Sequence, residues 1–229
     1  DGCQMTDAPA AVVTEQIAQI PYFQPETKCF DAFMAEGLIH YISQDLWEKY
    51  YQVVLAEAVN PEEIRKADLN IVYTPLCGTG NEPVREVLGR LGVKISVVAC
   101  QEKPDGDFKT CEYPNPETDA ALNESYKVAD TVECDVILGT DPDCDRVAIA
   151  VPCSEGGYQK LSGNELGCIL LDYILKSTKE NNAIPENAIA VRSIVSTPMA
   201  DKIASKYGVK MCAVLTGFKY IGGEILALE

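Results

Sequence analysis

Residues 134–151, CDVILGTDPDCDRVAIAV, contain the pattern on which the interpretation of the whole chain depends. Two apolar runs rich in β-branched residues flank a loop that carries three aspartates two residues apart, Asp141, Asp143 and Asp145. Arg146 follows at once. In an extended loop that leaves a strand, this spacing turns alternate side chains to one side. Converging carboxylates repel one another unless a cation lies among them, and hard oxygen ligands suit Mg²⁺. The stretch therefore predicts a strand–loop–strand unit that binds magnesium.

Three other interpretations of this loop are possible. An EF-hand requires Gly at the sixth loop position and a bidentate Glu at the twelfth, where this chain has Arg146 and Pro152. A phosphatase of the haloacid-dehalogenase type would use Asp141 as a nucleophile, but the third aspartate and the immediate return into an apolar run disfavour it. A solvated acidic turn would need no such phasing. The metal loop is the favoured interpretation.

Composition restricts the partners that the chain is expected to bind. The 229 residues are 47% hydrophobic and 24% charged, as in an ordinary globular protein. The formal net charge is −16, from 19 basic and 35 acidic residues. Such a surface repels phosphate backbones, so we expect no nucleic-acid partner. A phosphate-bearing substrate would need compensation by a metal or by selected basic side chains.

Other sequence features concern location and completeness. No apolar run is long enough to span a membrane, and no signal peptide is recognisable, so we expect no membrane association. The ten cysteines include no C-x-x-C pair, which favours free thiols and a cytoplasmic location. A single His offers no nucleophile–base pair. The chain does not begin with Met, and we expect it to be part of a longer protein.

From Leu69 onward, buried strand patterns alternate with amphipathic helix patterns, after a long helix predicted over 39–58. This rhythm predicts an α/β fold of two related three-layer α/β/α domains with mainly parallel mixed sheets, the second one truncated. The expected borders place the tail of a preceding domain and a linker helix in 1–39, the metal-loop domain in 40–156, and the incomplete second domain in 157–229.

Three further sites could carry chemistry. The Gly-rich loop 74–82, TPLCGTGNE, could offer backbone N–H groups to an anion or could be a tight turn. In 216–220, TGFKY, Lys219 could donate to a phosphate, or exchange a proton with a sugar hydroxyl if its pKa is lowered; a surface lysine is an equal alternative. Arg192 lies in an apolar strand pattern and needs a partner or a cavity.

Five motifs together resemble one family. They are GTDPDCDRVAIAV, TPLCGTGNEPVREVLGRLG, PDGDFKTCEYPNPE, LSGNELGCILLDYIL and TGFKYIGGEI. Their order and spacing are similar to those of the α-D-phosphohexomutases, in particular the bacterial phosphoglucomutase/phosphomannomutase group with its phosphopentomutase-like members. The resemblance covers nearly the whole chain, and the opening DGCQM resembles the end of that family's first domain.

The resemblance implies a four-domain parent enzyme. It moves a phosphoryl group between O1 and O6 of a hexose through a bisphosphorylated sugar, using a phosphoserine of the first domain and Mg²⁺. The three aspartates would be the metal ligands, and Arg146 would contact the phosphoserine or the substrate. Lys219 would be a candidate general acid or base on a sugar-binding loop with Thr216 and Gly217, and Arg192 would lie near the substrate.

Departures from the family pattern are also informative. The chain contains no phosphoserine loop, no acidic sugar-specificity loop and no phosphate loop of the fourth domain, and Cys77 stands where relatives carry His. We therefore expect a central fragment, inactive alone, whose partners are a hexose or pentose phosphate and the remaining domains of its parent. The alternatives are the phosphatase with an Asp nucleophile and a non-catalytic module that binds sugar phosphates.

Overall fold

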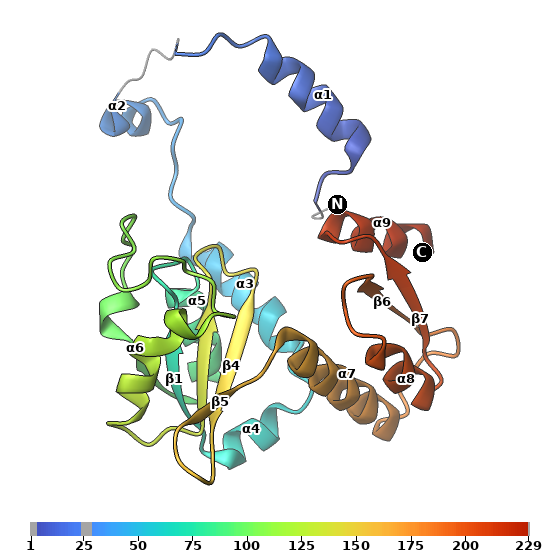
Figure 1. Ribbon diagram of the computed structural model, residues 1–229. Coiled ribbons are helices and arrows are strands. Elements are labelled where there is room, and N and C mark those ends of the chain that lie inside the picture. The colour runs from blue at the N-terminus through green and yellow to red at the C-terminus, as the bar shows by residue number, and fades with distance from the viewer. Residues whose placement is uncertain (1–3, 24–28, 229) are drawn as a thin grey trace. The chain divides into compact units, whose positions relative to one another are not determined.

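The computed structural model describes residues 4–23 and 29–228 (Figure 1). The chain divides into two compact units, one of Glu48–Ala183 and one that combines Asp1–Trp47 with Ile184–Glu229. Most of the DGCQM motif lies outside the described residues. The domain borders expected from the sequence stay predictions.

The unit of Glu48–Ala183 is built on a five-stranded sheet in the order β2-β1-β3-β4-β5. Strand β1 pairs in parallel with β2 and β3, whereas β3–β4 and β4–β5 are antiparallel. The strands are β1 (Asn70–Thr74), β2 (Lys94–Val97), β3 (Val136–Thr140), β4 (Val147–Pro152) and β5 (Tyr158–Lys160). From β1 the chain leads to β2 on one side of β1, and from β2 it crosses the sheet to β3 on the other side of β1. Right-handed crossovers then place the two connecting helices on opposite faces.

These two helices each cover an apolar layer. Helix α6 (Asp119–Ala129) lies over the face that carries Val72, Ile137 and Ala150 (Figure 1). The opposite face packs against α4 (Pro61–Ala67) and α5 (Asn81–Arg90). Because neighbouring residues in a strand alternate between faces, β1 and β3 contribute to both layers. The predicted three-layer α/β/α architecture is confirmed.

Helix α3 (Gln44–Ala56) crosses the border of the unit and is shorter at both ends than the predicted helix over 39–58. The starts of α6 and α7 (Gly163–Glu180), in contrast, follow their sequence signals. Helix α7 begins with a capping box, in which Ser162 and Glu165 bind each other's backbone N–H groups. Thr118 caps α6 through the N–H of Ala121. The short 3₁₀ helix η1 (Ala99–Gln101) follows β2.

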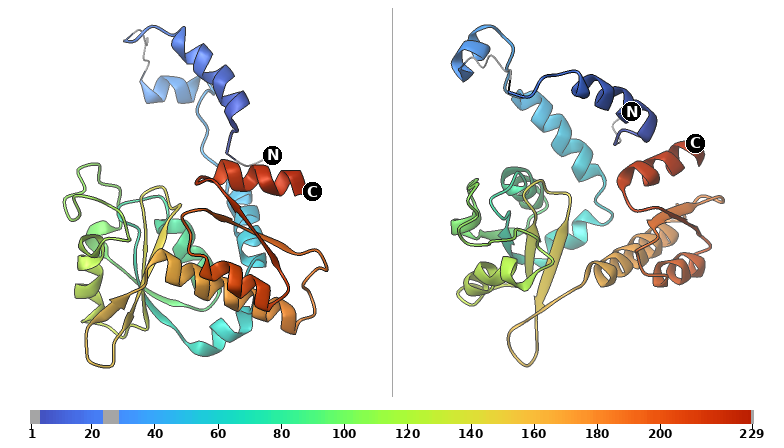
Figure 2. Two further views of the ribbon diagram at one scale, coloured as in Figure 1. Left: turned by 45° about the vertical axis from the view of Figure 1, so that its right-hand side comes forward. Right: turned by 45° about the horizontal axis from the view of Figure 1, so that its top comes forward.

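The second unit has a smaller described framework. The parallel pair β6 (Ile189–Ser193) and β7 (Lys210–Val214) contacts α8 (Met199–Lys206) and α9 (Phe218–Leu228), as Figure 2 shows. The same unit contains α1 (Asp7–Ala18) and α2 (Phe30–Ala35). The strand and helix patterns of 188–228 are all found, whereas neither α2 nor α4 was expected from the sequence. In the parts of the chain that the structure describes, no helix has the length and apolar character that crossing a bilayer requires.

Candidate metal centre

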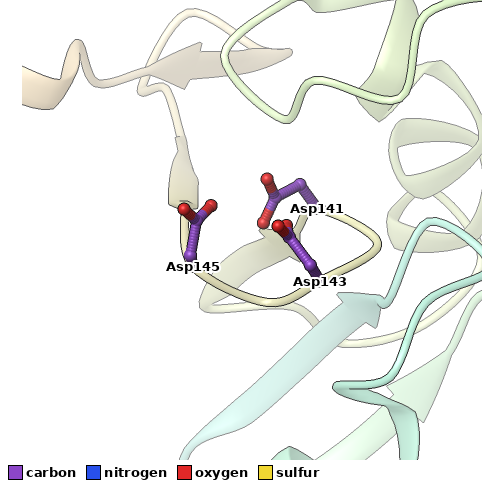
Figure 3. A group of neighbouring side chains, drawn as sticks. All are labelled: Asp141, Asp143 and Asp145. Carbon is purple, nitrogen blue, oxygen red and sulfur yellow. The ribbon is translucent and has the colours of Figure 1, made fainter. Parts of the chain in front are cut away.

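Three carboxylates meet at the carboxyl end of β3. Asp141, Asp143 and Asp145 lie in the loop that joins β3 to β4, and each can offer an oxygen within 4.8 Å of the oxygens offered by the other two (Figure 3). Asp141 is only 1% exposed, while the other two are exposed. Within the described residues, no other group of His, Cys, Asp and Glu side chains converges in this way.

The loop is a turn rather than an extended segment. Cys144 adopts a left-handed conformation with φ of 63°, and its N–H donates to the carbonyl of Asp141 at 3.0 Å. The N–H of Asp141 donates to the carbonyl of Arg146 at 3.4 Å, which closes the base of the loop. The predicted convergence of the aspartates is therefore found, but the reason given for it was wrong. Turn geometry brings the carboxylates together, and alternation along an extended chain does not.

Arg146 neutralises part of this negative charge. Its Nε donates to Asp141 Oδ2 at 2.8 Å, and its backbone N–H donates to Oδ1 at 3.0 Å. The same Nε lies 3.7 Å from Asp145 Oδ1. The guanidinium thus sits among two of the carboxylates, where a cation is needed.

The surroundings shift the pKa values of Asp141 and Asp145 in opposite directions. Burial acts to raise the pKa of Asp141, but the hydrogen bonds from Arg146 outweigh it, and the pKa lies below its usual value. A hydrogen bond with Asp141, then burial and the charges of Asp141 and Asp143, raise the pKa of Asp145. Asp141 is consequently held in its ionised form more firmly than Asp145.

Three backbone amides in the middle of the Gly-rich loop between β1 and α5 are used within the protein. The N–H of Cys77 donates to the Gln101 carbonyl at 2.8 Å, and that of Gly78 donates to the Pro75 carbonyl at 2.9 Å. The N–H of Thr79 donates to the Pro142 carbonyl at 2.8 Å. Of the two interpretations of this loop, the structure supports the tight turn.

Lys219 lies in the other unit, near the start of α9. Its ammonium is 2.6 Å from Asp7 Oδ1 and 4.9 Å from the centre of the Tyr220 ring. The hydrogen bond to Asp7 raises the pKa of Lys219. Proton exchange with a sugar hydroxyl requires a lowered pKa, so this environment favours the protonated, donating form. A catalytic role for Lys219 stays a prediction.

The residues before Lys219 form the turn between β7 and α9. Gly217 has φ of +127°, which L side chains rarely adopt, and its carbonyl accepts from the N–H of Tyr220 at 3.0 Å. Thr216 is exposed in the same turn. Substrate contacts by Thr216 and Gly217 stay predictions.

Arg192 has the partner that a cation in a strand requires. Its Nε and one terminal nitrogen bind Asp201 of α8 at 2.7 and 2.8 Å. Its other terminal nitrogen donates to the carbonyls of Ser193 and Ser196. These bonds tie β6 to α8, so the arginine has a structural role within this unit. Its contact with substrate stays a prediction.

Sequence reasoning missed the polar groups beneath the aspartate loop. The hydroxyls of Tyr73 and Thr140 lie 2.9 Å apart, and both side chains are buried. Thr74 donates to Gln101 Oε1 at 2.7 Å. A signal existed, because Tyr73, Thr74 and Thr140 place hydroxyls at the ends of otherwise apolar strands.

The site lies where α/β proteins usually bind ligands. In the strand order, β2 and β3 lie on opposite sides of β1. The side on which the chain adds strands therefore changes between β1 and β3, whose carboxyl ends are neighbours. Loops at such a switch point form the usual binding crevice. The fold and the clustered carboxylates together define a three-layer α/β protein with an acidic loop at this position.

Comparison with known proteins identifies the family. Residues 48–156 match the family described as "Phosphoglucomutase/phosphomannomutase, alpha/beta/alpha domain II". Residues 162–229 match the family described as domain III of the same proteins. The chain belongs to the phosphoglucomutase/phosphomannomutase family. It is 37% identical over 195 residues to the phosphoglucomutase of Staphylococcus epidermidis, covering 85% of this chain and 34% of the relative. The chain thus spans about a third of that relative's length.

Solved structures support the fold. A putative phosphomannomutase from Thermus thermophilus superposes with a TM-score of 0.63 at 19% identity, over 82% of this chain and 40% of the other. The Aspergillus fumigatus N-acetylphosphoglucosamine mutase, in complex with GlcNAc-6P and magnesium, superposes with a TM-score of 0.52 at 14% identity. This second match covers 76% of this chain and 34% of the other.

Proposed function

We propose that this chain is the central part of a phosphohexomutase and supplies the magnesium site for phosphoryl transfer on a sugar phosphate. The observation that carries the proposal is the convergence of Asp141, Asp143 and Asp145 within 4.8 Å at the carboxyl end of β3. Family membership supports the reaction class, and the magnesium complex of the Aspergillus mutase supports the metal.

The donor set fits magnesium. Three carboxylates offer hard oxygen ligands, which Mg²⁺ prefers, and the two exposed ones leave access for water and phosphate oxygens. When bound, the metal would neutralise charge on a phosphoryl group. Asp141, ionised and buried, would anchor it, and Asp143 and Asp145 would complete the protein ligands.

Arg146 would act beside the metal. Its guanidinium already lies among the carboxylates at 2.8 Å from Asp141, with 47% of the side chain exposed. An arginine with several donors suits the oxygens of a phosphate. We infer that Arg146 exchanges its carboxylate partners for the transferred phosphate once a metal compensates the aspartates.

Residues of the second unit would orient the sugar. In the proposal, Thr216, Gly217 and Arg192 contact a hexose or pentose phosphate, and Lys219 donates a proton or a hydrogen bond to it. The raised pKa of Lys219, caused first by Asp7, agrees with a donor rather than a base. Asp7 would have to release the ammonium for this role.

The chain would be inactive alone. The phosphoserine that gives and retakes the phosphoryl group would come from another domain of the parent, because the chain carries no serine loop of that kind.

The cytoplasmic location expected from the free cysteines belongs to the same proposal. Nine cysteines are free in the described part of the chain.

The test is substitution in the full-length parent enzyme. Asp141→Asn and Asp143→Asn should abolish Mg²⁺-dependent mutase activity, whereas Glu155→Gln should not. Glu155 is a matched control because it is an exposed carboxylate in the turn after β4. The aspartate loop precedes β4, so Glu155 lies at the opposite end of that strand. Retained activity in the two aspartate variants would show that the site is wrongly assigned. A beryllofluoride adduct on Asp141 would instead support the phosphatase alternative.

A further inference from the structure

Two loops of the larger unit lie against each other at the carboxyl ends of β1 and β3. We propose that the loop of Pro75–Gly80, called here the bracing loop, is a positioning element that fixes the aspartate loop in a geometry selective for Mg²⁺. The inference rests on the proposed metal site, but it concerns residues that do not themselves bind the ion. Four kinds of contact support it.

The first contact is a pair of hydrogen bonds to the aspartate loop. The N–H and the hydroxyl of Thr79 both donate to the carbonyl of Pro142, at 2.8 and 3.2 Å. Pro142 stands between Asp141 and Asp143, and proline has no N–H of its own. The carbonyl is therefore the only backbone hydrogen-bonding group of Pro142, and Thr79 binds it twice.

The second contact is backbone packing without a side chain between. A Cβ added to Gly78 would lie 2.5 Å from the carbonyl oxygen and 2.7 Å from the carbonyl carbon of Pro142, and closer still to its Cα. The φ angle of Gly78 is not in the left-handed region, so alanine could adopt this backbone conformation. Glycine is needed here because the two loops touch, and not because of its conformational freedom.

The third contact lies at the end of the bracing loop, just before α5. A Cβ on Gly80 would lie 2.6 Å from Tyr73 Oη, 2.8 Å from Cys144 Sγ and 2.9 Å from Thr140 Oγ1. Tyr73 and Thr140 hydrogen-bond to each other at 2.9 Å. The end of β3 and the turn residue Cys144 are thus packed directly onto the bracing loop and β1.

The fourth set of contacts anchors the bracing loop itself. Leu76 is 1% exposed and its N–H donates to Thr74 Oγ1 at 3.1 Å. Thr74 in turn donates to Gln101 Oε1, and the Gln101 carbonyl accepts from the N–H of Cys77. Both ends of the hydrogen-bond chain lie in buried structure. The bracing loop is therefore fixed to β1 and η1, and through it the aspartate loop is held in place relative to these two elements.

Metal selectivity is the property that such a brace would control. Mg²⁺ demands near-ideal octahedral geometry with short metal–oxygen distances, whereas Ca²⁺ accepts longer and more irregular coordination. Residues that orient metal ligands typically change affinity by about 10- to 100-fold when they are substituted. Loosening the brace should therefore weaken Mg²⁺ binding more than Ca²⁺ binding.

The experiment titrates the 229-residue chain with Mg²⁺ and with Ca²⁺ by calorimetry, comparing Gly78→Ala with the unmodified protein. We expect Mg²⁺ affinity to fall by about tenfold or more, and the ratio of Mg²⁺ to Ca²⁺ affinity to fall with it. Gly89→Ala is the matched control, since a Cβ there meets nothing within 4 Å. A general loss of folded protein would lower both affinities together and leave their ratio unchanged.

Two milder variants keep the proposal testable if Gly78→Ala does not fold. Thr79→Val removes only the hydroxyl bond to Pro142, and Tyr73→Phe removes only the bond to Thr140. Each should lower the Mg²⁺ to Ca²⁺ ratio and accelerate amide hydrogen exchange in 141–146. An unchanged ratio and unchanged exchange in folded brace variants would overturn the inference.

The failure of the brace and the failure of the metal site are distinguishable. If the unmodified chain binds Mg²⁺ and Asp143→Asn removes that binding while every brace variant keeps the original affinities, the metal site stands and the brace is wrong. If the unmodified chain does not bind Mg²⁺, or if Asp143→Asn leaves binding unchanged, both are wrong.

Discussion

The aspartate loop and the loop of 216–220 both follow a parallel strand, yet their surroundings differ. The aspartate loop follows β3, which has a hydrogen-bonded strand on each side, and its first aspartate, Asp141, is 1% exposed. The other loop follows β7, which pairs only with β6 among the described strands, and its Phe218 is 65% exposed. Similar local patterns therefore lead to a loop on buried structure in one unit and to an exposed loop in the other.

This difference teaches that packing beneath a loop, more than the loop's own sequence, prepares a site. Asp141 is held by Arg146 and by a turn that rests on buried Tyr73 and Thr140. The residue of the second loop that would act on substrate, Lys219, is instead bound to exposed Asp7. A two-stranded sheet buries little apolar surface and is marginal by itself.

The largest expected effect is on local stability. Amides of β1 and β3 should exchange with solvent at least about 100-fold more slowly than amides of β6 and β7, because opening free energies follow burial. Hydrogen exchange followed by mass spectrometry measures both regions in one sample. Equal protection in the two sheets would break the comparison, since it would mean that the second unit is as well supported as the first.

Core substitutions sharpen the same contrast. Leu122 of α6 is fully buried, and Leu122→Ala should lower the free energy of unfolding by about 2–5 kcal/mol. Leu226 of α9 is 71% exposed, and Leu226→Ala should change it by less than about 0.5 kcal/mol. Urea unfolding followed by circular dichroism tests the pair. Similar costs for the two leucines would contradict the burial difference.

A smaller effect is expected at the start of α7. Ser162→Ala removes the side-chain half of a capping box and should cost about 1 kcal/mol. Thermal unfolding of this variant is compared with that of Ser154→Ala, a serine exposed in the preceding turn. Equal melting temperatures for the two variants would mean that the cap contributes nothing to stability.

A last expected effect is an alkaline pH dependence of stability that comes from Tyr73, which is buried in β1. Burial raises the pKa of Tyr73 to about 12 from an ordinary value of 10.0. The unfolded chain therefore loses this proton first, so the stabilising contribution is complete below pH 10.0 and is lost as the pH rises toward about 12. Unfolding free energies measured across this window should fall less steeply in Tyr73→Phe. A slope unchanged by the substitution would argue against a buried, neutral Tyr73.

Much of the larger unit was predictable because its signals are local. The apolar strands, the Ser162 cap and the strand–loop–strand frame of the aspartates all follow from residue type and spacing. The short helix α4 was missed, although Pro61 opens it and two glutamates stand in its first turn. Such signals are weak where a helix has few turns.

The candidate site was only partly predictable. The three aspartates could be predicted as a group, but spacing did not indicate the left-handed turn at Cys144 that accompanies their convergence. The close approach of Gly78 to Pro142 could not be predicted either, because the two residues lie far apart in the sequence. The ion pairs of Arg192 with Asp201 and of Lys219 with Asp7 were equally inaccessible, because spacing gives no indication of a partner 9 or 212 residues away. Tertiary packing decides these features, and a single sequence does not display it.

The central claim is that the three aspartates form a prepared magnesium site within the larger unit. Calorimetric titration of the chain with Mg²⁺ tests it most directly, with Asp143→Asn and the control Glu155→Gln measured alongside. We predict saturable binding of one ion, lost in Asp143→Asn and kept in Glu155→Gln. Binding that is absent from the unmodified chain, or equal in all three proteins, would contradict the account.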